Sequence, residues 1–151
     1  MLAHSFALRT GRYSETGRIY LVTTVTYQRE PMFADFALAR AVIGELRKTD
    51  ALGHCTTLAY VLMPDHLHWL VQLQSGQLSS LVGRFKAGAC TTVNRLAGTV
   101  GIQRWQKGFH DHALRREEDI AGIARYIVAN PRRAGLVSHV GDYPHWDAVW
   151  V

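Results

Sequence analysis

The chain has 151 residues, of which 48% are hydrophobic and 10% aromatic. This length fits one domain, residues 1–151, with a core of its own. No segment reaches the about 18 apolar residues expected of a membrane span, and the N-terminal residues contain no apolar core of signal-peptide length. We therefore expect a soluble, cytoplasmic protein, associated with the nucleoid if it binds DNA, with no membrane partner.

The net charge is +5, from 17 Lys and Arg against 12 Asp and Glu. Arginine dominates, because only Lys48, Lys86 and Lys107 are lysines. The planar guanidinium suits bidentate contacts with phosphate and stacking on bases, which favours a nucleic-acid partner. An ordinary basic protein would explain the charge equally well.

The first half of the chain predicts a strand, a helix and a hairpin. Residues 18–26 are rich in β-branched and aromatic side chains, which favours a strand. Asp35 can cap a helix whose apolar residues recur at helical spacing up to about Gly53. Residues 55–63 and 66–73 are two apolar strands with Pro64-Asp65 in the turn between them.

The second half predicts two further helices and a strand. A helix is expected over residues 78–96, a short strand within residues 103–114, and a third helix over residues 117–130 that Pro131 stops. The aromatic tail from Gly141 is expected to pack as an extended cover. The order βαββαβ indicates an α/β (α+β) protein with a ferredoxin-like antiparallel sheet, both helices on one face, and an added C-terminal helix that carries Tyr126.

Two pairs of polar residues could form a chemical site. His66 and His68 lie two apart on a predicted strand, so both imidazoles point to one face and can lean toward one ion. Tyr126 and Asn130 lie outside the apolar stripe of the third helix, one turn apart on the same flank. If that flank faces the histidines, two imidazoles and an amide oxygen could hold a divalent ion beside a phenol.

Each of these residues also has a purely structural interpretation. A His-x-His pair on a strand is often two satisfied polar residues, a helical tyrosine usually packs, and an asparagine before proline often ends a helix. Spacing alone therefore favours the structural interpretations over a metal site with a nucleophile. His110 and His112 repeat the His-x-His spacing, and for them a DNA-facing or hydrogen-bonded surface role is expected, with any part in the site left open.

Longer stretches resemble a known family. The segment LMPDHLHWLV resembles the His-hydrophobic-His (HUH) motif of the single-tyrosine, single-strand DNA transposases, and ARYIVANPRRAGLV resembles their tyrosine helix. Three further segments resemble the branch called REP-associated tyrosine transposases: GRYSETGRIYLVTTVTYQREPMF, WQKGFHDHALRREEDI and YPHWDAVWV. Together these segments cover nearly the whole chain in order.

The resemblance implies a reaction and a role for each residue. His66, His68 and Asn130 would hold Mg²⁺ or Mn²⁺, and Tyr126 would be the nucleophile. The family cuts single-stranded DNA at hairpin-forming, REP-like repeats and leaves a 5′-phosphotyrosine with a free 3′-hydroxyl. A 3′-hydroxyl can reverse that attack, so cutting and joining would use one site.

DNA contacts are expected from arginines at two places. One group lies in or beside the N-terminal loop and the other surrounds the tyrosine helix, while Tyr13 or Trp105 could stack on unpaired bases. For any single arginine, a solvated side chain is the alternative. The residues expected to contact DNA are Arg12, Tyr13, Arg18, Arg115, Arg116, Arg125, Arg132 and Arg133.

Two other functions compete with the enzyme. The first is a sequence-specific DNA-binding protein of the same fold that no longer cleaves, and the second is a zinc-stabilised RNA-binding domain. The presence of His66, His68, Tyr126 and Asn130 together speaks against the first, and the absence of a cysteine-rich ligand set speaks against the second. The active form would be a monomer or a homodimer, since related insertion-sequence enzymes exchange the tyrosine helix whereas the repeat-associated branch acts as monomers.

Overall fold

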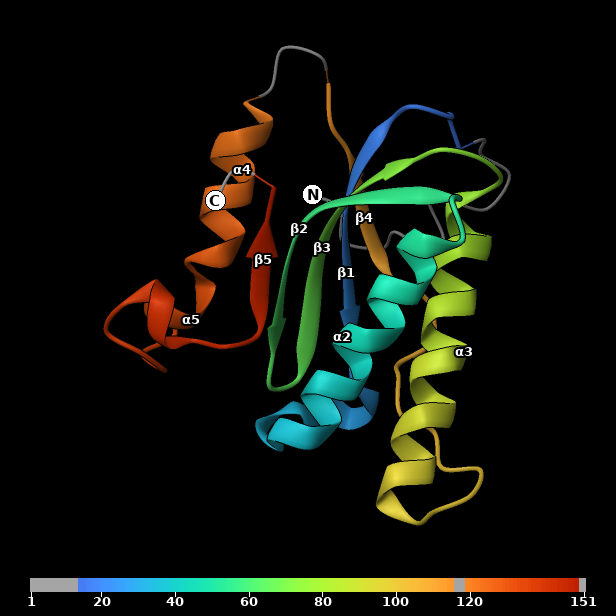
Figure 1. Cartoon of the computed structure of the whole chain (residues 1–151), viewed down its shortest axis with the longest axis vertical. Coiled ribbons are helices and arrows are strands. Elements are labelled where there is room, and N and C mark those ends of the chain that lie inside the picture. The colour runs from blue at the N-terminus through green and yellow to red at the C-terminus, as the bar shows by residue number, and fades with distance from the viewer. Residues whose placement is uncertain (1–13, 116–118, 150–151) are drawn as a thin grey trace.

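The computed structural model describes residues 14–115 and 119–149. It contains five strands, four α-helices and three short 3₁₀ turns (Figure 1). The elements are β1 (Ile19–Val25), α2 (Phe36–Ala51), β2 (Cys55–Met63), β3 (His66–Leu73), α3 (Leu78–Ala97), β4 (His110–Ala113), α4 (Ile120–Val128), α5 (Asn130–Arg133) and β5 (Trp146–Ala148).

The strands form one antiparallel sheet in the order β4-β1-β3-β2-β5. The first four strands, with α2 and α3 on one face, confirm the predicted ferredoxin-like βαββαβ arrangement. The tail differs from the prediction of an extended cover, because Trp146–Ala148 is a fifth strand that pairs with β2 from Ala59 to Val61. The pairing satisfies backbone groups at an edge that would otherwise be open.

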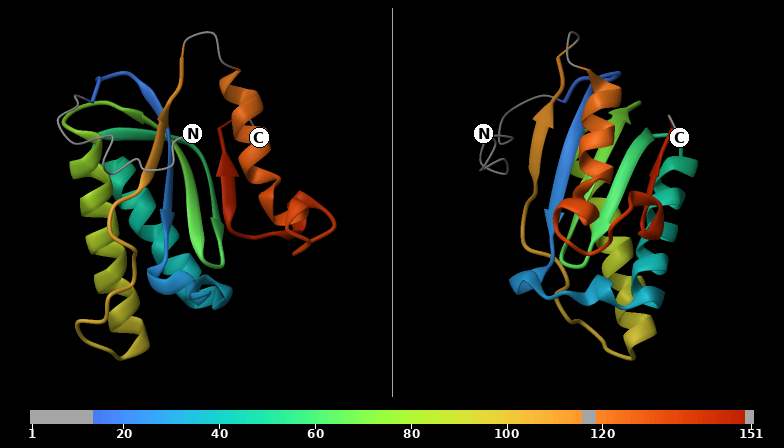
Figure 2. Two further views of the ribbon diagram at one scale, coloured as in Figure 1. Left: turned by 180° about the vertical axis from the view of Figure 1, so that it is seen from behind. Right: turned by 90° about the vertical axis from the view of Figure 1, so that its left-hand side faces the viewer.

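The sheet has two faces, and the side chains of β3 alternate between them. Leu67, Trp69 and Val71 of β3 point toward α2 and α3 and belong to the larger apolar core, in which Trp69 is fully buried. We call this side the α2–α3 face. Figures 1 and 2 show α2 and α3 side by side on it, with α4 on the opposite side of the sheet.

The opposite side, which we call the α4 face, is only partly covered. Leu70 of β3 packs there with Val61 of β2 and with Ala124 and Ile127 of α4. The C-terminal segment holds this layer in place, because the hydroxyl of Tyr143 donates a 2.6 Å hydrogen bond to the carbonyl of Leu62. His66 and His68 alternate with the core residues of β3 and so lie on this face, as predicted.

Helix ends follow the local sequence in two cases and depart from the prediction in a third. The Asp35 carboxylate accepts a 3.1 Å hydrogen bond from the amide of Leu38 and begins α2, while Gly98, at φ +71°, ends α3. The prediction that the third helix ends before Pro131 holds for α4, which ends at Val128, but a second short helix follows at once. Pro131 lies in the first turn of α5, where its missing N–H costs no hydrogen bond, so the chain continues helically to Arg133.

The predicted start of the third helix, at residue 117, lies outside the described residues. α4 is described from Ile120, with the Asp119 carboxylate accepting a 2.9 Å hydrogen bond from the amide of Gly122. Within the described ranges, no helix is both long and apolar enough to cross a membrane.

Candidate active site on the α4 face

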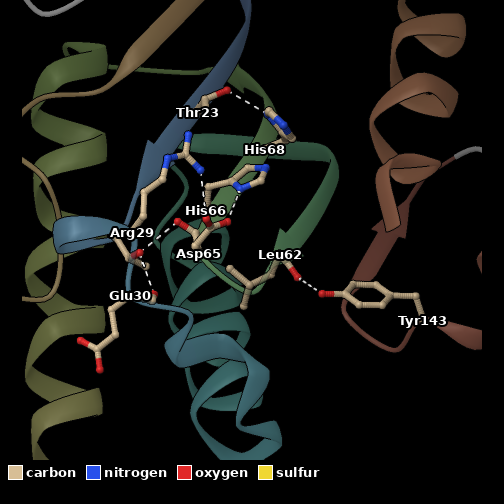
Figure 3. A network of polar contacts seen from close by, with 9 residues as sticks. Thr23, Arg29, Glu30, Leu62, Asp65, His66, His68 and Tyr143 are labelled. Atoms are coloured by element: carbon tan, nitrogen blue, oxygen red, sulfur yellow. Dashed lines mark hydrogen bonds and ion pairs between the residues drawn. The ribbon is translucent and has the colours of Figure 1, made fainter. Parts of the chain in front are cut away.

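The two histidine rings meet on the α4 face of β3. Their ring centroids are 4.8 Å apart, with the ring planes at 80°. Figure 3 shows both imidazoles projecting from β3 to the side of the sheet on which α4 lies. The predicted placement of His66 and His68 on one face of the strand is therefore present.

Each histidine is held through its Nδ1 atom. His68 Nδ1 is 2.9 Å from the Thr23 hydroxyl on β1, and His66 Nδ1 is 2.7 Å from the Asp65 carboxylate in the hairpin turn. Among the described residues, neither Nε2 atom has a hydrogen bond. Partners at Nδ1 fix the tautomer and the orientation of a metal-binding histidine, and they leave Nε2 available as the ligand atom.

Burial, together with the charges of His66 and Arg133, lowers the pKa of His68 to about 4. The imidazole is then neutral at physiological pH, which is the form that binds a cation. Below that pKa a proton would occupy the ligand atom.

Asp65 is anchored by a strained turn between β1 and α2. Arg29 donates a 2.9 Å hydrogen bond to Asp65 (Figure 3). The amide and hydroxyl of Thr26 donate to the Asp65 carbonyl at 3.0 and 3.1 Å. Gln28 and Arg29 both adopt left-handed φ angles, 55° and 54°, which cost on the order of 1 kcal/mol for each non-glycine residue. The strained turn places Arg29 against Asp65, which indicates that the fold holds the Asp65 carboxylate in a defined position.

The Asp65 carboxylate is the charged partner of His66. Burial acts to raise its pKa, but the hydrogen bonds from His66 and Arg29 outweigh this and lower it. The ionised carboxylate can accept the Nδ1 proton of His66 and keep Nε2 as the open nitrogen. The sequence placed Asp65 in the hairpin turn but gave no site role to Asp65, Thr23 or Arg29; for Asp65, its place directly before His66 in a tight turn was a usable signal.

Tyr126, Asn130 and His68 line one hollow between α4 and the sheet, with a volume of about 810 Å³. Leu21, Ile123 and Ile127 form its apolar walls. Tyr126 is 64% exposed, and Ile127 beside it is buried, so the tyrosine points away from the layer that fixes α4. Tyr126 and Asn130 thus share one flank, as predicted, and both line the hollow with His68, which meets the condition that the sequence left open.

His112 also lines this hollow, whereas His110 does not. Both residues are on β4, where they pair with Leu21 and Thr23 of β1. Their partner strand is therefore not a hairpin neighbour, which explains why the sequence offered no local sign of the pairing. In the described part of the chain, no group of three or more His, Cys, Asp and Glu side chains converges as a metal-ligand set.

The residues expected to contact DNA have different surroundings. Arg18 donates a 3.0 Å hydrogen bond to the Leu114 carbonyl and pairs with Glu15, and it lines a second hollow of about 730 Å³ together with Arg115. Arg125 lies 3.6 Å from Asp119 on the exposed side of α4. Arg12, Tyr13 and Arg116 lie outside the described residues.

Two further predicted DNA contacts, Arg132 and Arg133, are exposed on α5. Trp105 does not fit the base-stacking role. Only 6% of it is exposed, and its ring packs against Phe33 and Phe85 at centroid distances of 5.7 and 6.0 Å. It is a core residue of the α2–α3 face.

Comparison with known proteins gives the family of this chain. A "Putative REP-associated tyrosine transposase" of Haemophilus influenzae is 31% identical over 101 residues, 59% of this chain and 56% of that protein. The REP-associated tyrosine transposase of Escherichia coli K12 is 29% identical over 87 residues, 57% of this chain and 50% of that protein. The chain thus spans about half the length of the curated relatives it matches.

Similarity extends to solved structures and to a family model. The structure of a REP-associated tyrosine transposase bound to a REP hairpin superposes with a TM-score of 0.67 and 25% identity, covering 89% of this chain and 79% of that one. The model described as "Transposase IS200 like" matches residues 16–130, most of the chain and all of the histidine and tyrosine elements. The chain belongs to the IS200-like transposase family.

Proposed function

We propose that this protein is a metal-dependent endonuclease and strand transferase for single-stranded DNA, acting at hairpin-forming repeats through a 5′-phosphotyrosine intermediate. One observation carries the proposal: the exposed phenol of Tyr126 shares a hollow with His68 and Asn130 on the histidine face of the sheet. A phenol, an imidazole and a carboxamide from three different elements line it together. Family membership and the hairpin bound by the related structure support the same substrate class.

The donor set fits Mg²⁺ or Mn²⁺. The ligand atoms would be Nε2 of His66, Nε2 of His68 and Oδ1 of Asn130, because the Nδ1 atoms are already engaged by Asp65 and Thr23. An amide oxygen suits a hard cation better than it suits zinc. When bound, such a cation supplies Lewis-acid polarisation of the scissile phosphate and neutralises charge that develops in the transition state.

Tyr126 performs the covalent step. Its Oη attacks phosphorus and forms a P–O bond, the bond from phosphorus to the 3′-oxygen breaks, the phenol loses its proton to solvent, and the leaving oxygen takes one up as a 3′-hydroxyl. A free phenol has a pKa near 10, so the attack needs a site that favours the phenolate. The tyrosine ester keeps a reactive phosphodiester, and attack by a 3′-hydroxyl rejoins strands with no external energy source.

His68, Tyr126 and Asn130 of one chain line the same hollow, and the ring of His66 lies beside that of His68 at a centroid distance of 4.8 Å. Tyr126 lines the hollow with His68 of its own chain, which supports action as a monomer with the tyrosine used in cis. Arg18 and Arg115 line the second hollow, beside the start of β1. They would neutralise phosphates of the hairpin. Binding carried by such contacts weakens steeply with salt, and an affinity unchanged by salt would contradict this role.

The test is the capture of the covalent intermediate. Labelled oligonucleotides that form a hairpin with a single-stranded flank are incubated with the protein and Mn²⁺, and a protein–DNA band that survives denaturation is expected. The band disappears in Tyr126→Phe and persists in the control Tyr27→Phe, which removes another partly exposed tyrosine hydroxyl. Hairpin binding without any such band, across several hairpins, would favour the alternative of a DNA-binding protein of this fold that no longer cleaves.

A further inference from the structure

Arg133 contacts two of the proposed site residues at once. Its guanidinium carbon lies 3.8 Å from the centroid of the Tyr126 ring, and its Nη2 donates a hydrogen bond to Oδ1 of Asn130. The same charge reaches the histidines, because after burial and the charge of His66 it contributes to the lowered pKa of His68. One side chain on α5 therefore touches the nucleophile and the amide ligand and lies near an imidazole ligand.

The continuous path of α4 and α5 produces this placement. Ala129 keeps helical φ and ψ between the two helices, and the amides of Arg133 and Ala134 donate to the carbonyls of Ala129 and Asn130 at 3.0 and 2.8 Å. Tyr126, Asn130 and Arg133 are spaced by four and three residues and so follow one flank of a helix. Helical side chains point back toward the N-terminus, which carries the guanidinium over Asn130 to the tyrosine ring.

The hydrogen bond to Asn130 uses an atom with a second assignment. Under the proposed function, Oδ1 is the amide oxygen that would bind the divalent cation. A guanidinium and a dication at one oxygen repel each other, and the repulsion is strong where the surroundings are partly desolvated. Arg133 must therefore leave Oδ1, or weaken its bond to it, when a cation binds there.

We propose that Arg133 is a positioning residue that holds the Tyr126 ring in place and competes with the divalent cation for the Asn130 amide oxygen. The proposal rests on the proposed function. In the metal-free protein Arg133 ties Asn130 to Tyr126 and keeps the site closed to cations at that oxygen. In the loaded protein its planar fork stays over the ring and is free to meet a phosphate of the substrate.

The competition predicts changes of opposite sign in two measurements. In calorimetric titrations without DNA, Arg133→Ala is expected to bind Mn²⁺ about tenfold more tightly than wild type, because a hydrogen bond to a charged group and one positive charge no longer oppose binding. At saturating Mn²⁺, the same variant is expected to form the covalent DNA adduct about tenfold or more slowly, since Tyr126 loses the contact that orients it. A residue needed only for folding would weaken both.

Two further variants separate charge from geometry. Arg132→Ala removes the same charge one position away on α5, and its Mn²⁺ affinity is expected to change by less than about twofold because an exposed charge is screened. Arg133→Lys keeps the charge without the planar fork, so adduct formation stays slow. Because Arg133 is exposed, both Arg133 variants are expected to keep the thermal melting profile of wild type.

The outcomes distinguish this proposal from the one on which it rests. Wild type that binds Mn²⁺ while Arg133→Ala binds it equally or less tightly would overturn the competition and leave the proposed function standing. Wild type that binds no Mn²⁺ would overturn both. Full adduct formation by Arg133→Lys would show that charge, and not the stacked fork, is what Tyr126 needs, and would overturn the positioning role.

Discussion

The two faces of the sheet are built from the same strands but differ in their side chains: one is apolar and buried, and the other carries polar groups beside a hollow. On the α2–α3 face, β3 presents Leu67, Trp69 and Val71 to two long helices, and every one of these side chains is buried. On the α4 face the alternating positions hold His66 and His68, and one helix of nine residues leaves a hollow beside them. The comparison shows that one face stabilises the sheet sufficiently for the other to carry polar groups and an open site.

Stability provides the largest contrast between the faces. Trp69→Ala should lower the free energy of unfolding by about 3–5 kcal/mol, because it empties a fully buried position and removes the indole N–H that donates to Thr57. Tyr126→Ala should cost less than about 1 kcal/mol, since the ring is exposed and loses mainly its contact with Arg133. Urea denaturation measures both, and comparable losses would show that the tyrosine belongs to the core.

Metal affinity should be sensitive to the α4 face alone. His66→Ala and His68→Ala are each expected to weaken Mn²⁺ binding by more than about 100-fold. Replacing a residue that only hydrogen-bonds to a metal ligand usually costs about 10- to 100-fold. His54→Ala is the matched control: this histidine lies between α2 and β2, bonded to Ser75, and its loss should leave the affinity unchanged. Equal effects of all three substitutions would mean that Mn²⁺ binds nonspecifically.

Replacing Asp65, which hydrogen-bonds to His66, should have a smaller effect on Mn²⁺ affinity. Asp65→Asn keeps the shape of the turn but removes the charge that holds Nδ1 of His66, and we expect Mn²⁺ affinity to fall by about 10- to 100-fold. Asp142→Asn, an exposed carboxylate near the C-terminus, serves as the control for loss of one negative charge. A weak effect of Asp65→Asn would indicate that the strained turn serves the hairpin and not the ligand.

The smallest expected effect is a pH dependence of stability. The pKa of His68 is about 4 in the folded chain against 6.5 when exposed, so the unfolded chain binds more protons in between. In metal-free protein, the free energy of unfolding should therefore fall as pH decreases from about 6.5 to about 4. His145, also with a burial-lowered pKa, adds to this trend.

His68→Gln isolates the contribution of His68 to that trend. The variant should flatten the slope by an amount on the order of 1 kcal/mol over the same pH interval, as followed by denaturation at several pH values. An unchanged slope would mean that His68 is protonated as easily in the folded chain as in the unfolded one, and that the α4 face is more open to water than its burial indicates.

The sequence was most informative where structure is local. The hairpin bounds at Cys55, Met63, His66 and Leu73, and the cap at Asp35, depend on nearby residues and were predicted correctly. β5 was missed because a strand of three residues after a proline exists only through its pairing with β2. The path through Pro131 was missed because a proline that ends one helix can equally begin the next.

The candidate site divides in the same way. The common orientation of His66 and His68 follows from the period of a strand, and the common flank of Tyr126 and Asn130 follows from the period of a helix. That Tyr126 and Asn130 share a hollow with His68 depends on how α4 docks, which no local pattern contains. The anchors Thr23 and Arg29 contact His68 and Asp65, which follow them by 45 and 36 residues, only in the folded chain.

The Tyr126 phenol and a divalent cation bound by the two imidazoles should occupy one site. Titrating Mn²⁺ into protein with isotope-labelled tyrosine rings tests it without any choice of DNA, because the paramagnetic ion broadens nearby ring signals most. The Tyr126 signal, identified by its loss in Tyr126→Phe, should broaden first, before that of Tyr60, which is buried on the α2–α3 face. A Tyr126 signal that stays sharp while the histidines bind Mn²⁺ would contradict the account.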